Sequence, residues 1–277
     1  MEVKKLHGLI IKDDPRYDYT KSYLEQKGFI IYKDFDKNLI DKIDFILFPF
    51  KKEIDKNIYD KNFFSSLKKL EKNILIFTGV ENKYIKKNAQ EFNLNYEPLM
   101  NLDYIAILNA IPTAEGVIAY LIQNRKKTIM GAKILVIGYG RCGSVLAEKL
   151  FYLGAKVFVH TRSQSSYSRA ISNRIQPFYD LNNLYNFYGD KNKNKKDFDV
   201  IINTAPVKII TDKELLNINN KTLIIDITRD GLDIDLARSK NKFSTRLLGI
   251  PAKFAVQTAG EILGKYIYEK VTLKNAT

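Results

Sequence analysis

The stretch that decides the fold is Lys133-Ile134-Leu135-Val136-Ile137-Gly138-Tyr139-Gly140-Arg141-Cys142-Gly143. It begins as an apolar strand and continues as a turn in which the glycines have the spacing G-x-G-x-x-G. Ser144–Leu153, which follows, has the composition of a helix, and a second apolar strand ends at His160. This order predicts a βαβ unit that binds a dinucleotide, because a helix N-terminus behind a glycine turn offers backbone N–H groups to phosphate.

Each glycine of the turn has an expected role. Gly138 permits the tight turn, Gly140 lets the pyrophosphate approach the backbone, and Gly143 lets the helix pack closely on the strand. A glycine turn in a βαβ unit without a ligand is the alternative. The residues between the glycines are also expected beside the cofactor: Tyr139, Arg141 and Cys142.

The end of the second strand indicates which dinucleotide is bound. NAD-binding domains usually carry Asp or Glu there, where it binds the ribose 2′-OH. This chain instead continues as Thr161-Arg162-Ser163 and has no acid at that point. A guanidinium fork at Arg162 suits a 2′-phosphate, and Ser163 adds a hydroxyl. The sequence therefore favours NADP over NAD, with a plain surface arginine as the alternative.

A polar loop, Asn203-Thr204-Ala205-Pro206, follows the apolar run Val200–Ile202. Ligands of doubly wound sheets bind outside the carboxyl ends of the strands, so this loop is expected to line the dinucleotide. An ordinary turn closed by Pro206 is the alternative.

The loop Asp226–Gly231 reaches the same edge of the sheet after the strand Thr222–Asp226. Arg229 is its only cation and is the best-placed group for an acidic substrate. The alternative is that Arg229 pairs with a neighbouring acid, Asp226, Asp230 or Asp233, and serves structure only.

The whole chain has 277 residues, enough for two domains. Strands alternating with helices predict an α/β protein: a Rossmann-type doubly wound parallel sheet plus a smaller N-terminal α/β domain. The expected parts are a substrate-side domain to about residue 110, a linking helix within 111–130, a Rossmann domain over 131–250, and a C-terminal helix within 251–277 that packs on the first domain.

The individual elements follow from apolar runs and helical spacing. The expected strands are Leu6–Ile11, Phe29–Tyr32, Phe45–Phe48, Ile74–Phe77, Tyr104–Leu108, Lys133–Ile137, Lys156–His160, Val200–Asn203, Thr222–Asp226 and Arg246–Leu248. The expected helices are Tyr19–Lys27, Asn62–Glu71, Lys83–Phe92, Pro112–Arg125, Cys142–Leu153, Ser165–Asn173 and Ala255–Val271.

Composition narrows the class of protein. The net charge is +14, but the lysines are dispersed, and the densest run, Lys191–Lys196, is expected in a solvated loop, so no nucleic-acid partner is predicted. The single cysteine suggests a reducing cytoplasm. No signal peptide, no apolar run near membrane-spanning length and no metal site are expected.

The histidines exclude one kind of chemistry. His7 and His160 are the only ones, at the start of the first strand and on the adenosine side of the Rossmann domain. Neither is where a 2-hydroxy-acid dehydrogenase needs an acid/base histidine, opposite the nicotinamide. No serine or cysteine nucleophile is indicated either.

Several motifs together resemble the dipicolinate synthase A family of spore-forming bacteria. They are Asn109-Ala110-Ile111-Pro112-Thr113-Ala114-Glu115-Gly116, the glycine turn with Arg162-Ser163, Asn203-Thr204-Ala205-Pro206, and Thr258-Ala259-Gly260-Glu261-Ile262-Leu263. The chain departs from that family at Lys12-Asp13-Asp14, where a Gly-Gly-Asp turn is usual, and in a shortened stretch at Gly249–Lys253.

The resemblance implies an NADP-dependent oxidation of a dihydrodipicolinate-type precursor to pyridine-2,6-dicarboxylate, in the mother-cell cytoplasm during sporulation. It also implies a flavoprotein-like partner, dipicolinate synthase B, and we expect an oligomer. Another NADP-dependent oxidoreductase of a small carboxylic acid, or a non-catalytic NADP-binding protein, remains open.

The substrate's carboxylates need cationic or hydrogen-bonding groups. The helix N-termini near Pro112 and Val256 are expected as additional anion sites. The candidate residues are Arg229, Thr113, Thr258 and Lys253.

Overall fold

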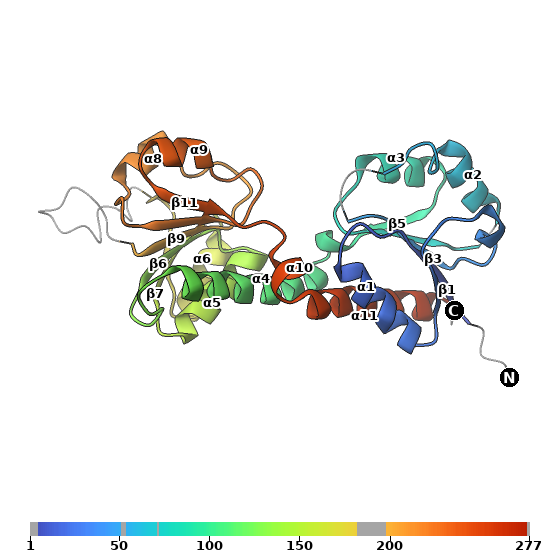
Figure 1. The fold of residues 1–277 in the computed structure, drawn as a ribbon, viewed down its shortest axis with the longest axis horizontal. Coiled ribbons are helices and arrows are strands. Elements are labelled where there is room, and N and C mark those ends of the chain that lie inside the picture. The colour runs from blue at the N-terminus through green and yellow to red at the C-terminus, as the bar shows by residue number, and fades with distance from the viewer. Residues whose placement is uncertain (1–4, 51–53, 71, 182–197, 276–277) are drawn as a thin grey trace, which may run out of the picture. The chain divides into compact units, whose positions relative to one another are not determined.

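The structure is a computed structural model that describes residues 5–50, 54–70, 72–181 and 198–275. The chain forms two compact units (Figure 1). Unit 1 comprises Met1–Asn109 and Ala255–Thr277, and unit 2 comprises Ala110–Phe254. Each unit contains one parallel sheet between helices, so the predicted α/β class is confirmed.

Unit 2 is built on a six-stranded sheet with the order β11-β10-β9-β6-β7-β8. All neighbouring strands are parallel, and the order reverses between β6 and β9, the point at which Rossmann folds bind dinucleotides. The strands are β6 (Lys133–Ile137), β7 (Lys156–His160), β8 (Gln176–Phe178), β9 (Val200–Asn203), β10 (Leu223–Asp226) and β11 (Phe243–Arg246).

Alternate residues of these strands face two hydrophobic layers. On one face, Val136, Val159 and Ile202 pack with residues of α4 (Asp103–Asn124), α5 (Arg141–Tyr152), α6 (Gln164–Ser172) and α10 (Ile250–Phe254). On the other face, Leu135 and Ile201 pack with α8 (Asp212–Asn217) and α9 (Ile234–Ser239). Helices cover both faces, as the near-continuous apolar strands require.

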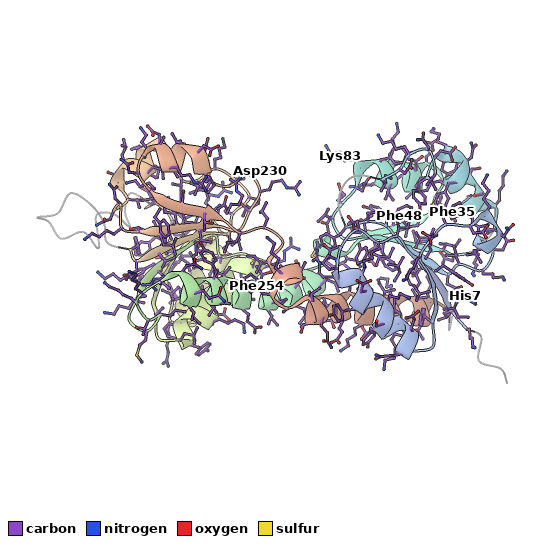
Figure 2. All side chains as sticks on the ribbon, viewed as in Figure 1. His7, Phe35, Phe48, Lys83, Asp230 and Phe254 are labelled. Carbon is purple, nitrogen blue, oxygen red and sulfur yellow. The ribbon has the colours of Figure 1, made fainter. Side chains whose placement is uncertain are left out.

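Unit 1 has a five-stranded parallel sheet with the order β2-β1-β3-β4-β5. Helices α1 and α11 cover one face, while α2 and α3 cover the other. Figure 2 labels Phe48 and Phe35, two members of the aromatic cluster beneath α2. The elements are β1 (His7–Ile10), α1 (Arg16–Gln26), β2 (Ile30–Tyr32), η1 (Lys37–Leu39), β3 (Phe45–Leu47), α2 (Lys61–Lys69), β4 (Leu75–Thr78), α3 (Lys83–Glu91), β5 (Asn95–Pro98), η2 (Leu99–Asn101) and α11 (Val256–Asn275).

The C-terminal helix α11 lies beside α1, although the two are at opposite ends of the chain (Figure 1). The buried Thr20 hydroxyl of α1 donates to the Gly260 carbonyl at 2.9 Å. A Cβ on Gly260 would overlap the Arg16 carbonyl oxygen, so the two backbones pack at close range. Unit 1 therefore needs both ends of the sequence.

Helix α4 corrects the prediction for the segment between the units' sequences. It begins at Asp103, so the strand predicted over Tyr104–Leu108 is wrong, and Pro112 lies inside the helix and not at its start. By length and composition alone α4 is apolar enough to cross a membrane, contrary to the expectation from sequence; core helices of soluble proteins pass the same test. Its Val117 and Leu121 are fully buried in the core of unit 2.

Other differences are small. The last strand is β11, and it precedes the predicted Arg246–Leu248 because the apolar pair Leu247-Leu248 follows the strand. The lysine run Lys191–Lys196 lies outside the described residues. Five short elements had no sequence prediction: β5, β8, α8, α9 and α10.

Candidate functional site

A continuous row of residues marks the carboxyl edge of the unit 2 sheet. Strand register aligns His160 with Ile137, Ile137 with Asn203, Asn203 with Asp226, and Asp226 with Arg246. The loops after β6, β7, β9 and β10 all leave from this row. The predicted cofactor residues and Arg229 therefore reach the same edge of one sheet.

The glycine turn has the geometry that its sequence predicts. Gly138 has φ +96°, a left-handed conformation that favours glycine. A Cβ on Gly143 would overlap the Gly138 carbonyl oxygen, so only glycine lets α5 approach the strand this closely. A Cβ on Gly140 would meet no atom within 4 Å, which leaves open space beside the backbone.

The loop after β9 closes onto the glycine turn. Thr204 donates its hydroxyl to the Ile137 carbonyl at 3.0 Å, and its backbone N–H donates to the same oxygen at 2.9 Å. The Thr204 Oγ1 atom would be 2.7 Å from a Cβ on Gly138. The threonine thus braces the turn, which is a structural contact and does not require a ligand.

Helix α5 begins at Arg141 behind Gly140, and no side chain caps its N-terminus. An uncapped N-terminus directed at open space beside Gly140 fits a pyrophosphate, because backbone N–H groups and the helix dipole both favour an anion. The residues present therefore fit a dinucleotide.

Two residues of the turn direct their side chains away from solvent. Tyr139 is 1% exposed, and its hydroxyl contacts Glu148 Oε1 at 3.2 Å and Asn173 Nδ2 at 3.2 Å. Burial raises the pKa of the Cys142 thiol to about 12. At these positions only the backbone is available to a cofactor, because the side chains belong to the interior of unit 2.

The loop after β7 presents one free cation. Arg162 is exposed and forms no ion pair with any residue that the structure describes. Ser163 caps α6, since its hydroxyl accepts from the Ser166 N–H at 3.4 Å. Thr161 is buried, and burial lowers the pKa of His160 beside it. Arg162 is therefore the side chain of this loop that is available for a 2′-phosphate.

A buried carboxylate, Asp226, organises the loops that sequence reasoning treated separately. It is fully buried and accepts hydrogen bonds from Asn203 Nδ2 at 2.9 Å, Thr228 Oγ1 at 2.8 Å and the Leu232 N–H at 2.9 Å. Its cationic partner is Arg246, at 3.4 Å, which also donates to the Leu232 carbonyl.

Gly231 brings the β9 and β10 loops into direct backbone contact. A Cβ there would overlap Asn203 Nδ2 and Thr228 Oγ1, and would lie 2.8 Å from the Ala205 carbonyl oxygen. The Asn203 amide in turn spans Ala205, donating to its carbonyl at 3.1 Å and accepting from its N–H at 3.2 Å. The two loops thus form one packed unit.

Arg229 extends from this packed unit without an ion pair among the described residues. Of the three acids considered as its partners, Asp226 is bound by Arg246, and Asp233 caps α9 by accepting from the Leu236 N–H. The third, Asp230, is exposed and is labelled in Figure 2. The geometry therefore leaves the Arg229 guanidinium available for an external anion.

The remaining predicted substrate residues do not join this site. Thr113 lies inside α4 and not at a helix end, because α4 begins at Asp103, so the anion site expected near Pro112 is wrong. Lys253 is exposed on α10 of unit 2. Thr258 is exposed in the first turn of α11, which begins at Val256 and belongs to unit 1.

Sequence reasoning missed the residues that hold the site together. Asp226 was considered only as a partner for Arg229, and the alignment of Asp226 with Asn203 and Arg246 requires the strand order, which single motifs do not give. In the part of the chain that the structure describes, no group of three His, Cys, Asp or Glu side chains could hold a metal ion.

No protein-family profile matches the chain. Among curated proteins it is similar to dipicolinate synthase A of Bacillus subtilis (strain 168), one component of a synthase with more than one kind of polypeptide, with 33% identity over 195 residues. The matched segment covers 70% of this chain and 63% of that relative, which is less than two thirds of the relative's length.

Solved structures extend the similarity. The A chain of dipicolinate synthase from Bacillus subtilis has a TM-score of 0.85 and 26% identity, over 99% of this chain and 98% of that chain. Dipicolinate synthase A from Bacillus halodurans has a TM-score of 0.81 and 26% identity, over 96% and 97%.

A more distant similarity concerns the fold alone. A D-isomer specific 2-hydroxyacid dehydrogenase from Lactobacillus delbrueckii ssp. bulgaricus, solved in an NAD-complexed form, has a TM-score of 0.67. It is 11% identical, over 98% of each chain. The chain thus has the dehydrogenase-type Rossmann fold that its glycine turn predicts.

Proposed function

Since the chain is related to dipicolinate synthase A in sequence and in fold, as its motifs predict, we propose that it oxidises a dihydrodipicolinate-type precursor to pyridine-2,6-dicarboxylate with NADP⁺. The observation that carries the proposal is one sheet edge with two anion sites. An open glycine turn suits a dinucleotide, and Arg229, without an ion pair among the described residues, suits a carboxylate.

The cofactor assignment rests on the loop after β7. That loop has no acid to bind a ribose 2′-OH, and its exposed Arg162 has a guanidinium suited to a 2′-phosphate. The fit supports NADP⁺ in preference to NAD⁺. When bound, the nicotinamide supplies the acceptor for a ring hydride.

The chain's own residues bind and orient the substrate. Arg229 holds one carboxylate, and the packed β9 and β10 loops fix the position of Arg229 relative to the glycine turn. The reaction also releases one ring proton, which goes to water. Formation of an aromatic pyridine favours this loss, so the mechanism requires no strongly basic side chain.

A 2-hydroxy-acid dehydrogenase is the second candidate, because the fold is shared with that class. The histidines argue against it. His160 is buried at the end of β7, which is separated from β10 by β6 and β9, and burial lowers its pKa. His7 belongs to β1 of unit 1. Neither histidine lies in the loop of Arg229, where the substrate is expected.

The proposal extends to biology in three respects. We propose that the flavoprotein-like dipicolinate synthase B is the partner, that the chain acts in the mother-cell cytoplasm of a sporulating bacterium, and that it forms an oligomer. The name of the Bacillus subtilis relative, which designates one component of a larger synthase, supports the first point.

The direct test mixes the chain with NADP⁺ and freshly generated precursor, with and without dipicolinate synthase B, and follows dipicolinate formation. Formation of dipicolinate by the isolated chain supports the proposal in full. Cofactor binding without turnover, followed by turnover when the partner is added, would identify a cofactor-binding component. No dipicolinate in either mixture, with oxidation of another small acid, would overturn the substrate assignment.

A further inference from the structure

A second arginine, Arg169, lies against the glycine turn from the side of α6. Its Nη2 atom donates to the Tyr139 carbonyl at 3.3 Å and to the Ser166 hydroxyl at 3.4 Å. Its guanidinium carbon is 5.6 Å from the centroid of the Tyr139 ring. The side chain thus joins the first turns of α6 to the turn between β6 and α5.

The contacts of Arg169 use only part of its hydrogen-bonding capacity. They involve Nη2, so Nε and Nη1 donate to no residue that the structure describes. The Tyr139 ring beneath is fixed by its own network, in which Asn173 Nδ2 donates to Glu148 Oε1 at 2.7 Å. Arg169 is therefore a positioned cation with donors to spare.

Arg162 and Arg169 belong to the same β7–α6 connection. Arg162 follows β7 directly, where Rossmann domains bind the adenosine ribose, and Arg169 reaches the same place from α6. No Asp or Glu occurs between Lys156 and Tyr179, so no carboxylate of this segment competes for either guanidinium.

We propose that Arg169 is a second specificity-determining residue, which binds the 2′-phosphate of NADP⁺ together with Arg162. The inference rests on the proposed function, since it concerns the same cofactor. The two guanidiniums clamp the phosphate between the end of β7 and the glycine turn. The competing role is a purely structural one, in which Arg169 only ties α6 to the Tyr139 carbonyl.

The two roles differ in which ligand they affect, and binding alone separates them. A 2′-phosphate contact matters for NADP⁺ and for 2′,5′-ADP, whereas a structural tie supports every dinucleotide equally. We would titrate the full-length chain with NADP⁺, NAD⁺ and 2′,5′-ADP by calorimetry, in the absence of any substrate. The variants are Arg169→Gln, Arg169→Lys and a control, Arg238→Gln, which removes one exposed positive charge from α9.

For Arg169→Gln we expect NADP⁺ and 2′,5′-ADP to bind about tenfold more weakly, the loss typical of one charge-assisted hydrogen bond, with NAD⁺ affinity nearly unchanged. Arg169→Lys keeps a point charge and loses the planar fork, so its loss is smaller but confined to the same two ligands. Arg238→Gln should leave all three affinities unchanged, because its charge is remote from the turn.

Other outcomes overturn the inference in distinct ways. Equal weakening of NADP⁺ and NAD⁺, or no weakening at all in a variant that melts like the wild type, assigns Arg169 a structural role. If Arg169→Gln does not fold, the same two criteria apply to Arg169→Lys. Preference of the wild-type chain for NAD⁺ would instead refute the cofactor of the proposed function, and the inference with it.

Discussion

At the scale of single residues, Arg229 is the group on which the proposed chemistry depends. Replacing it with Lys keeps the charge but removes the bidentate fork. We expect Arg229→Lys to lower turnover by about tenfold or more, with NADP⁺ affinity and melting temperature nearly unchanged, because the contact is made to the substrate. Steady-state dipicolinate formation, cofactor titration and melting on one preparation check this.

The structure sharpens that prediction, since the acid expected to pair with Arg229 most directly, Asp226, is bound by Arg246. Unchanged turnover in the Lys variant would remove Arg229 from the active site. The search would then move to the other predicted substrate residues, Lys253, Thr113 and Thr258.

Arg162 carries the prediction on cofactor choice. Arg162→Ala should weaken NADP⁺ by about tenfold or more, the equivalent of about 1.5–3 kcal/mol for a hydrogen bond to a charged group. NAD⁺ should be affected little, because it lacks the 2′-phosphate. Fluorescence titration with both cofactors is the measurement, and a similar loss for both would show that Arg162 does not bind the phosphate.

Single residues were predictable where backbone geometry decides their role. The left-handed Gly138 and the close packing at Gly143 follow from the motif, because only glycine meets those conditions. The directions of the Tyr139 and Cys142 side chains did not follow, since the motif describes the path of the backbone and not the packing beneath it.

At the scale of elements, the β9 and β10 loops act as one body. Gly231→Ala would place a methyl group on Asn203 Nδ2 and Thr228 Oγ1, where the neighbours belong to a buried hydrogen-bond network. We expect a loss of about 2 kcal/mol or more in the free energy of unfolding, as for overpacked interiors. Chemical denaturation measures it.

Gly249→Ala is a suitable control for that experiment. Gly249 also precedes a helix of unit 2, but its left-handed φ of +65° is strained by any side chain, while a Cβ there would meet no atom within 4 Å. Its cost should be about 1 kcal/mol, from backbone conformation alone. A smaller loss for Gly231→Ala than for this control would contradict the packed-loop interpretation.

Most strands of unit 2 could be predicted because both of their faces are buried, which leaves long apolar runs in the sequence. The elements that escaped prediction lack that signal. Strand β5, Asn95–Pro98, lies at the edge of its sheet and is largely polar. In α4, Pro112 and Glu115 resemble helix-start signals although the helix begins at Asp103, because tertiary packing tolerates the interior proline.

At the scale of the whole molecule, unit 1 is assembled from two distant segments of sequence. Leu263, Ile267 and Val271 of α11 are fully buried in its core. Burial of each such side chain contributes about 1.5–3 kcal/mol, and a domain's total stability is only about 5–15 kcal/mol.

A chain ending at Phe254 should therefore fail to fold unit 1 while unit 2 still binds NADP⁺. Hydrogen exchange checks the first half, through lost protection of β1 and β4, and cofactor titration checks the second. Native-like protection of β1 and β4 in the shortened chain would show that α11 is dispensable for unit 1.

Cys142 gives the molecule a built-in reporter of its own breathing. It is the only cysteine, and with a pKa of about 12 its thiol is almost entirely protonated at pH 8. A thiol reagent should modify it only during transient openings of the glycine turn, so the rate of modification times those openings. Bound NADP⁺ should slow the reaction in proportion to its occupancy, which would convert a mass-spectrometric time course into a cofactor affinity. Modification of the native chain as fast as that of the unfolded chain would show that the thiol is not shielded.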